Sequence, residues 1–234
     1  MIRFLLPLFL GLGAAAPAVA ADVIRHEGSR LLCERGEGEE PDAAKAQAPC
    51  LAETKGVVTR SGDVLVVGIA GGKSVRFASN PKACANDDAE KCKIVRLAAF
   101  DPARSFAVVE ETLYEGGAVQ LVDLRDGSKV DLLATPEFSP SGGLAVAVIA
   151  DLLNVPDFEI LLYDLTAKPF RRLYAAKAGT ATKLAGKKGD VAQFAFEAWQ
   201  GEDRVLIRLG DGDAVFKRLA LTRDGAQWRL IDAK

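Results

Sequence analysis

One unit occurs twice in the middle of this chain, and it constrains the fold more than any other feature. The clearer copy starts at residues 138–143 (Phe-Ser-Pro-Ser-Gly-Gly), continues through the apolar run 144–149, and ends at 159–165 (Glu-Ile-Leu-Leu-Tyr-Asp-Leu). A fainter copy starts at 100–102 (Phe-Asp-Pro) and ends at 121–127 (Leu-Val-Asp-Leu-Arg-Asp-Gly). In both, an aromatic residue and a proline turn precede an apolar strand, and a second strand ends in Asp-Leu. The recurrence predicts two antiparallel units of one kind.

The spacing of the copies is typical of a four-stranded propeller blade. Phe100 and Phe138 are 38 positions apart, and Asp123 and Asp164 are 41 positions apart, against roughly 40 to 45 residues for such a blade. Weaker copies are predicted at 196–219 and 57–77. Apolar runs and turns predict about 14 or 15 strands, too few for five blades of four strands. We therefore expect an all-β fold of repeated antiparallel meanders, a small or incomplete β-propeller, with a β-sandwich of two meander sheets as the alternative.

In this interpretation of the repeat, the turn residues have structural roles. Proline sets φ for the turn, and the glycines that follow accept positive φ where the next strand begins. Phe100 and Phe138 are expected to anchor the core between sheets, because isolated phenylalanines at strand ends are mostly buried.

These residues resemble the WD-like propeller repeats of exported bacterial proteins. In that family a Phe-Ser-Pro-Asp-Gly turn precedes one strand and an Asp-Leu-x-x-Gly turn follows the next. The matching positions are 138–142, 164–165 and 123–127, with Ser141 in place of the usual Asp. The resemblance is clearest over residues 94–174 and covers the rest poorly. It implies no enzymatic activity, and it implies loops that are presented to another protein.

The first 20 residues have the organisation of a secretory signal peptide. Arg3 precedes an apolar run over 4–12, and small residues end at Ala20, after which we expect cleavage. Pro7 and Gly11 interrupt a run that is already short for a transmembrane anchor. The mature chain is therefore expected to be periplasmic or secreted, with no integral membrane segment.

The rest of the chain is expected to form one domain with an N-terminal extension. Residues 21–55 are polar and predict an irregular segment with a disulfide loop, which contains a short strand at 23–25 and one or two helical turns at 42–48. Residues 56–234 predict a single propeller-like domain. Loops without regular structure are expected at 80–91 and 175–188. Removal of the leader changes the formal net charge from −2 to −3, and charges of both signs are interspersed. No basic face is expected, which argues against nucleic acid as a partner.

The four cysteines predict two structural disulfides. Four cysteines in an exported chain allow three connectivities, and the spacing favours the local pairs Cys33 with Cys50 and Cys84 with Cys92. Each pair would close a polar loop that has little apolar surface of its own. A metal or redox site is the alternative, but the chain has no Cys-x-x-Cys motif and one histidine, His26.

No catalytic, cofactor or metal-binding residue is predicted. There is no Gly-x-Ser-x-Gly elbow to form a triad with His26. Adjacent Glu110 and Glu111 would point to opposite sides of a strand, which makes them a poor catalytic pair. The turn 211–213 (Asp-Gly-Asp) is too short for a calcium site, and the lysines of the loop at 183–188 predict a soluble connection.

The function expected from these observations is that of an exported, non-enzymatic interaction module whose partner is another envelope or secreted protein. The first alternative is a small-molecule or glycan-binding protein, which an exposed Trp199 or Trp228 in a concave site would favour. The second is a carboxylate-dependent hydrolase, which convergent acids with a raised pKa in a central pocket would favour.

Overall fold

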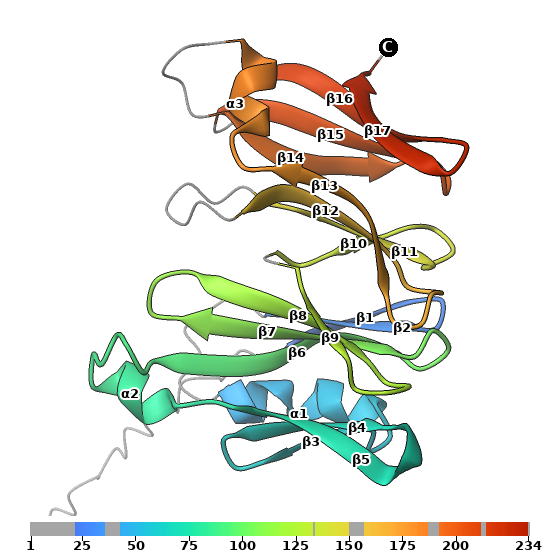
Figure 1. The fold of residues 1–234 in the computed structure, drawn as a ribbon. Helices are drawn as coiled ribbons and strands as arrows, with labels where there is room; N and C mark the ends of the chain where they lie inside the picture. Colours follow the sequence, from blue (N-terminus) through green and yellow to red (C-terminus); the bar gives the residue numbers. More distant parts are fainter. Residues whose placement is uncertain are drawn as a thin grey trace, which may run out of the picture.

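The computed structural model describes residues 22–35, 43–132, 134–149, 157–186, 192–211 and 214–233. Within these ranges the chain is mostly β and forms four antiparallel, meander-like sheets (Figure 1). The expectation of repeated antiparallel meanders is therefore confirmed. The predicted signal peptide lies outside the described residues.

The sheets follow one another along the chain, except that the N-terminal hairpin joins the second one. The three-stranded sheet contains β3 (Val58–Ser61), β4 (Val64–Ile69) and β5 (Lys73–Ala78), with the 3-10 turn η1 (Ala70–Gly72) between the last two. The six-stranded sheet has the order β1 (Val23–Glu27), β2 (Arg30–Glu34), β6 (Lys93–Asp101), β7 (Phe106–Leu113), β8 (Gly117–Asp123) and β9 (Lys129–Asp131). The third sheet contains β10 (Glu137–Phe138), β11 (Leu144–Val148), β12 (Phe158–Asp164) and β13 (Arg171–Lys177). The fourth contains β14 (Gln193–Trp199), β15 (Arg204–Asp211), β16 (Ala214–Asp224) and β17 (Gln227–Asp232).

The four sheets are stacked in a row, with the three-stranded sheet at one end and the fourth sheet at the other (Figure 1). A separate apolar cluster fills each of the three interfaces. Leu65 and Leu97 are fully buried in the first interface, and Phe106 in the second. Phe194 and Ile207 are fully buried in the third. Each sheet therefore contributes the alternate, inward-facing side chains of its strands to a core that it shares with its neighbour.

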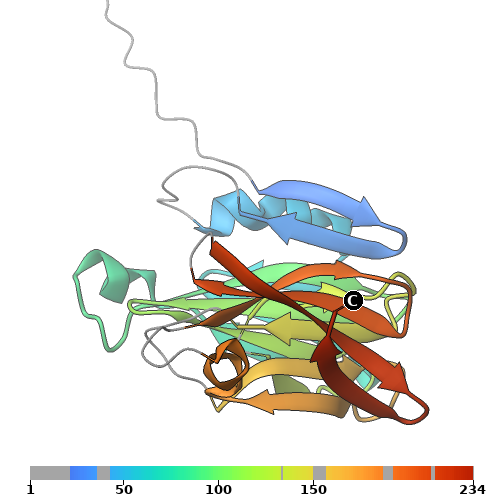
Figure 2. The same ribbon diagram turned by 90° about the horizontal axis from the view of Figure 1, so that it is seen from above.

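Residues 22–35 and 43–55 contain more regular structure than the sequence led us to expect. β1 and β2 form a hairpin around Gly28, whose φ is +64°. β2 then pairs with β6 through Leu31 with Phe100 and Leu32 with Ala99. Viewed along the row of sheets, this hairpin lies to one side (Figure 2). The N-terminal segment is thus built into the largest sheet rather than appended to it.

The helix α1 (Ala43–Glu53) satisfies the part of the β6 edge that β2 leaves uncovered. The Gln47 side chain is 1% exposed; its Nε2 donates to the carbonyl of Leu97 at 2.9 Å, and the Leu97 N–H donates to its Oε1 at 3.2 Å. Arg60 Nη2 donates to the same Oε1 at 3.0 Å. Because buried backbone groups need partners, this amide takes the place of a neighbouring strand.

The two sequence copies occupy equivalent turns. Asp123 ends β8, and its Oδ1 accepts the N–H of Arg125 at 2.8 Å. Asp164 ends β12, and its Oδ1 accepts the N–H of Thr166 at 2.9 Å. An aspartate that bonds to the backbone two residues further on stabilises a turn. The shared Asp-Leu signal therefore corresponds to the same local structure in neighbouring sheets.

Two loops that were expected to lack regular structure contain short helices. Asn80 caps α2 (Pro81–Ala85) by accepting the N–H of Ala83 at 3.4 Å, and Pro81 occupies the first turn. β13 extends into the second loop, where α3 (Thr180–Ala185) lies between two glycines of positive φ, Gly179 and Gly186. Helices of one or two turns are too short to produce a helical period in the sequence. Among the described helices, none is long and apolar enough to cross a membrane.

Both predicted disulfides are present. Cys33 pairs with Cys50 across a separation of 17 residues, and Cys84 pairs with Cys92 across 8 residues. The first connects β2 to α1 and lies in the core, with Cys33 3% and Cys50 0% exposed. The second closes the loop that contains α2, outside the core clusters.

Replacing Cys33 and Cys50 by alanine should destabilise the protein more than replacing Cys84 and Cys92. Both changes remove a cross-link worth about 3 kcal/mol, but only the first also removes buried side chains from the core, for a total of about 4 kcal/mol. Chemical denaturation of the two double variants would measure the difference. Equal losses, or two or more free thiols in the denatured, non-reduced protein, would contradict this account.

Candidate functional site

A cleft of about 500 Å³ lies where the β1–β2 hairpin meets the following sheets. We call it the hairpin cleft. The hairpin, β6, β7, β10 and β14 supply its walls, so three of the four sheets contribute. Its charged and aromatic lining residues are Arg25, Glu27, Glu34, Arg35, Glu110, Glu137, Phe138, Phe196 and Trp199.

The aromatic residues of the hairpin cleft come from the first strands of the third and fourth sheets. Phe138 ends β10 and stacks on Phe106, with ring centroids 5.0 Å apart. Trp199 ends β14, and its Nε1 donates to the carbonyl of Glu137 at 3.3 Å. Phe138 was expected to be a core anchor only; it is partly exposed and lines the cleft, whereas Phe100 is 4% exposed and lies in the core.

Charged residues of both signs line the cleft together with these aromatic residues. Arg25 forms an ion pair with Glu34, which links the two strands of the hairpin. Glu110 accepts a hydrogen bond from the Thr135 hydroxyl at 2.6 Å. Two arginines and four glutamates line the cleft, so its formal charge is negative but mixed. Such a surface can bind a ligand that carries both hydrogen-bond donors and charged groups.

The surroundings of Glu137 in the cleft raise the pKa of its carboxyl group. Partial enclosure by the cleft walls raises its pKa above the ordinary value of 4.5, and the nearby charge of Glu27 adds to the effect. The positive charges of Arg30 and Arg25 oppose the shift. Glu137 still reaches solvent at the rim of the cleft. It is therefore a carboxyl group that gains a proton more readily than a free glutamate.

A second, smaller pocket of about 370 Å³ is lined by the β1–β2 turn, and we call it the turn pocket. It shares Glu27, Phe138 and Trp199 with the hairpin cleft. The rest of its lining comes from the hairpin turn and from the two proline turns of the sequence repeat: Gly28, Ser29, Arg30, Arg104, Ser139 and Pro140. The two cavities are thus neighbouring parts of one concave region.

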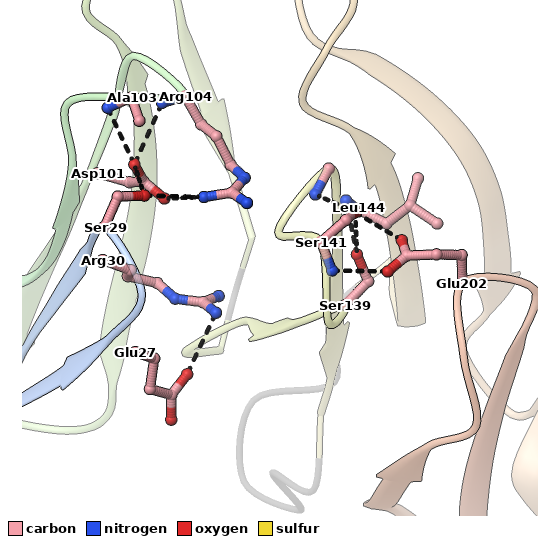
Figure 3. Close-up of polar contacts among 11 residues, drawn as sticks. Glu27, Ser29, Arg30, Asp101, Ala103, Arg104, Ser139, Ser141, Leu144 and Glu202 are labelled. Atoms are coloured by element: carbon pink, nitrogen blue, oxygen red, sulfur yellow. Dashed lines mark hydrogen bonds and ion pairs between the residues drawn. The ribbon is translucent and has the colours of Figure 1, made fainter.

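Polar contacts around the turn pocket hold the surrounding turns together (Figure 3). Arg104 Nη1 donates to Ser29 Oγ at 2.9 Å and to Asp101 Oδ2 at 2.8 Å, which joins the hairpin turn to the turn after β6. Glu202 accepts the N–H of Ser141 at 2.6 Å and its hydroxyl at 2.7 Å. Burial alone would raise the pKa of Glu202, but these hydrogen bonds outweigh it and lower the pKa.

Only some of the candidate site residues considered in the sequence analysis line the hairpin cleft. Trp199 lines the cleft, whereas Trp228 is 7% exposed and belongs to the core between the third and fourth sheets. Glu110 lines the cleft and Glu111 pairs with Lys93 at 3.6 Å, so the adjacent glutamates do not act on one site.

Other candidate residues lie away from the cleft or cannot be placed. His26 is exposed on β1 and does not line either cavity. Gly212, Asp213, Lys187 and Lys188 lie outside the described residues. Within the ranges that the structure describes, no three His, Cys, Asp or Glu side chains are grouped so that they could hold a metal ion.

Sequence reasoning missed Glu137 and Arg30. Neither stands in a recognisable motif, and both acquire their surroundings only when the hairpin docks beside β10. Phe138 carried a signal, because it is the aromatic residue of the repeat unit. No family model and no curated protein sequence matches the chain.

Replacing Glu137 by glutamine should stabilise the folded protein slightly at neutral pH, by about 0.5 kcal/mol or less because solvent screens the group. A carboxyl group with a raised folded pKa penalises the folded state where it is ionised, above that pKa, and the penalty disappears below the unfolded value. Thermal denaturation at about pH 7 and about pH 4 should show a gain at the first pH and none at the second. The exposed Glu115→Gln serves as the control, and a stability loss in E137Q at neutral pH would refute the assignment.

Proposed function

We propose that this chain is an exported, non-enzymatic interaction module that binds a polypeptide segment of another envelope or secreted protein in the hairpin cleft. The observation that carries the proposal is the composition of the cleft, in which charged residues of both signs line the same cavity as Phe138, Phe196 and Trp199. Aromatic residues within a polar rim are characteristic of protein-binding surfaces. A nucleic acid would need a positive surface instead.

The position of β1 supports a polypeptide ligand. β1 is the first strand in the order of the six-stranded sheet, and it supplies Arg25 and Glu27 to the cleft. An edge strand presents backbone donors and acceptors, to which an extended peptide can add as a further strand. Side chains of such a peptide would then contact Phe138, Phe196 and Trp199 of the cleft.

Two further parts of the proposal concern compartment and architecture. The predicted signal peptide and the two disulfides support the periplasm or the cell exterior, because disulfides persist in oxidising compartments.

We infer that the row of sheets is an open, incomplete propeller. The four-stranded meanders β6–β9, β10–β13 and β14–β17 support this inference. The first strand of each meander (β6, β10 and β14) lines the cleft.

A small-molecule or glycan ligand is the second candidate, and Trp199 is the observation that favours it. The cleft volume of about 500 Å³ is typical of small-ligand sites, and a tryptophan face can stack on a sugar or a flat ring. A carboxylate-dependent hydrolase would use Glu137 as its proton donor.

Selection from a displayed peptide library should enrich peptides that bind the mature protein, and Trp199→Ala should weaken their binding about tenfold or more, as expected for a central aromatic residue. The matched control is Tyr114→Ala, which changes an exposed aromatic residue outside the cleft lining. Titration calorimetry measures both. Enrichment of no peptide, together with saturable binding in a glycan array, would replace the proposal with the second candidate.

A further inference from the structure

Arg30 is a buried cation with an incomplete set of partners. Its side chain is 7% exposed, and its guanidinium lies 4.2 Å from the centroid of the Phe138 ring. Nη2 lies 3.2 Å from a carboxylate oxygen of Glu27, an exposed side chain. Nε and Nη1 are both buried and have no hydrogen-bond partner among the described residues. Burial lowers the pKa of Arg30, while the charges of Glu27 and Asp101 oppose that change.

The neighbouring arginines of the repeat turns are satisfied in a way that Arg30 is not. Arg104 donates to Asp101, whose side chain is fully buried, and to Ser29. Arg125 donates from Nε, Nη1 and Nη2 to Asp123 and to two backbone carbonyls. Enclosed donors without acceptors cost free energy, and those of a charged group cost most. An acceptor that reached Nε or Nη1 of Arg30 would remove this cost.

The turn pocket is the cavity in which such an acceptor would lie beside Arg30. Arg30 is one of its lining residues, and the hydroxyl-bearing Ser29 and Ser139 line it as well. Figure 3 shows the Arg30 guanidinium between the turn that carries Asp101 and Arg104 and the turn that carries Ser139 and Ser141. Phe138 and Trp199 supply apolar walls.

We propose that the turn pocket is a subsite for a carboxylate, which accepts hydrogen bonds from Arg30 while the adjoining apolar part of the ligand contacts Phe138 and Trp199. This inference rests on the proposed function, because the carboxylate would belong to the bound polypeptide, as a chain terminus or as an acidic side chain. A singly charged group fits better than a phosphate, since Glu27, Asp101 and Glu137 all act electrostatically on Arg30. Arginine and carboxylate form short, charge-assisted hydrogen bonds.

The first test uses a small probe and does not depend on any selected peptide. Nitrogen-15-labelled mature protein is titrated with 3-phenylpropionate and, separately, with 3-phenylpropanamide, which has the same ring without the charge. The acid should shift the Arg30 Nε–H and Trp199 Nε1–H resonances in a saturable way, and the amide should leave the Arg30 resonance in place. An unmoved Arg30 resonance, or equal shifts with the acid and the amide, would overturn the subsite.

The second test uses variants and distinguishes the two sources of the carboxylate. Arg30→Gln should weaken binding of the acid about tenfold, the loss typical of one charge-assisted pair, and Arg30→Lys should retain part of it. Arg76→Gln, an exposed arginine on β5, is the matched control. A selected peptide that loses affinity on C-terminal amidation uses its terminus, and one that loses affinity when glutamate is replaced by glutamine uses a side chain.

The outcomes separate this subsite from the proposed function. If selected peptides bind through Trp199 and bind R30Q as tightly as the wild type, the subsite is wrong and the interaction module stands. If no peptide is enriched and the acid still binds through Arg30, the carboxylate subsite stands and the polypeptide ligand is wrong. Loss of folding in R30Q, seen by circular dichroism, leaves R30K and the resonance shifts as the deciding measurements.

Discussion

The pairing of β2 with β6 is the interaction on which the rest of the concave region depends. Without β2, β6 would present an open edge. An edge strand that is not paired, covered or charged can pair with a strand of another chain. β2 covers one end of that edge through Leu31 and Leu32, and Gln47 of α1 satisfies the backbone at Leu97. The Cys33–Cys50 disulfide fixes the two covering elements to each other. Both cavities lie against the hairpin held in this way.

The same turns serve both the fold and the candidate site. Asp101 accepts the N–H groups of Ala103 and Arg104, each at 3.1 Å, and so shapes the turn after β6. The equivalent turn after β10 provides Ser139 and Pro140 to the turn pocket. A repeat that recurs for structural reasons therefore places similar polar turns around the hairpin. The hairpin adds the charged residues Glu27 and Arg30 to the turn pocket.

Much of the fold could be predicted from the sequence, because local patterns carry it. Alternating apolar residues and Gly or Asp turns predicted most strands after residue 56, and cysteine spacing predicted both disulfides. β1 was predicted as a shorter strand, whereas β2 was missed, because its apolar run is short and its pairing with β1 and β6 cannot be detected from the local sequence. β10 has two residues and leaves no period to detect. The sequence did not predict the row of four sheets itself, which depends on contacts between distant segments.

The candidate site could be predicted only in part for the same reason. Trp199 and Phe138 stand at strand ends in the repeat, and Trp199 was among the candidates for a concave site. Glu137 and Arg30 are 107 positions apart, and their shared surroundings exist only in the folded chain. Long-range placement of charged groups has no single-sequence signature, whereas local turn chemistry does.

The docking of the hairpin against β6 is the central claim, and nuclear Overhauser contacts across that pair test it most directly. The folded mature protein should show cross-strand contacts between Leu31 and Phe100 and between Leu32 and Ala99, together with slow amide exchange at the two leucines. Absence of these contacts, with Leu31 and Leu32 amides that exchange as fast as those of a chain terminus, would contradict the account and remove both cavities with it.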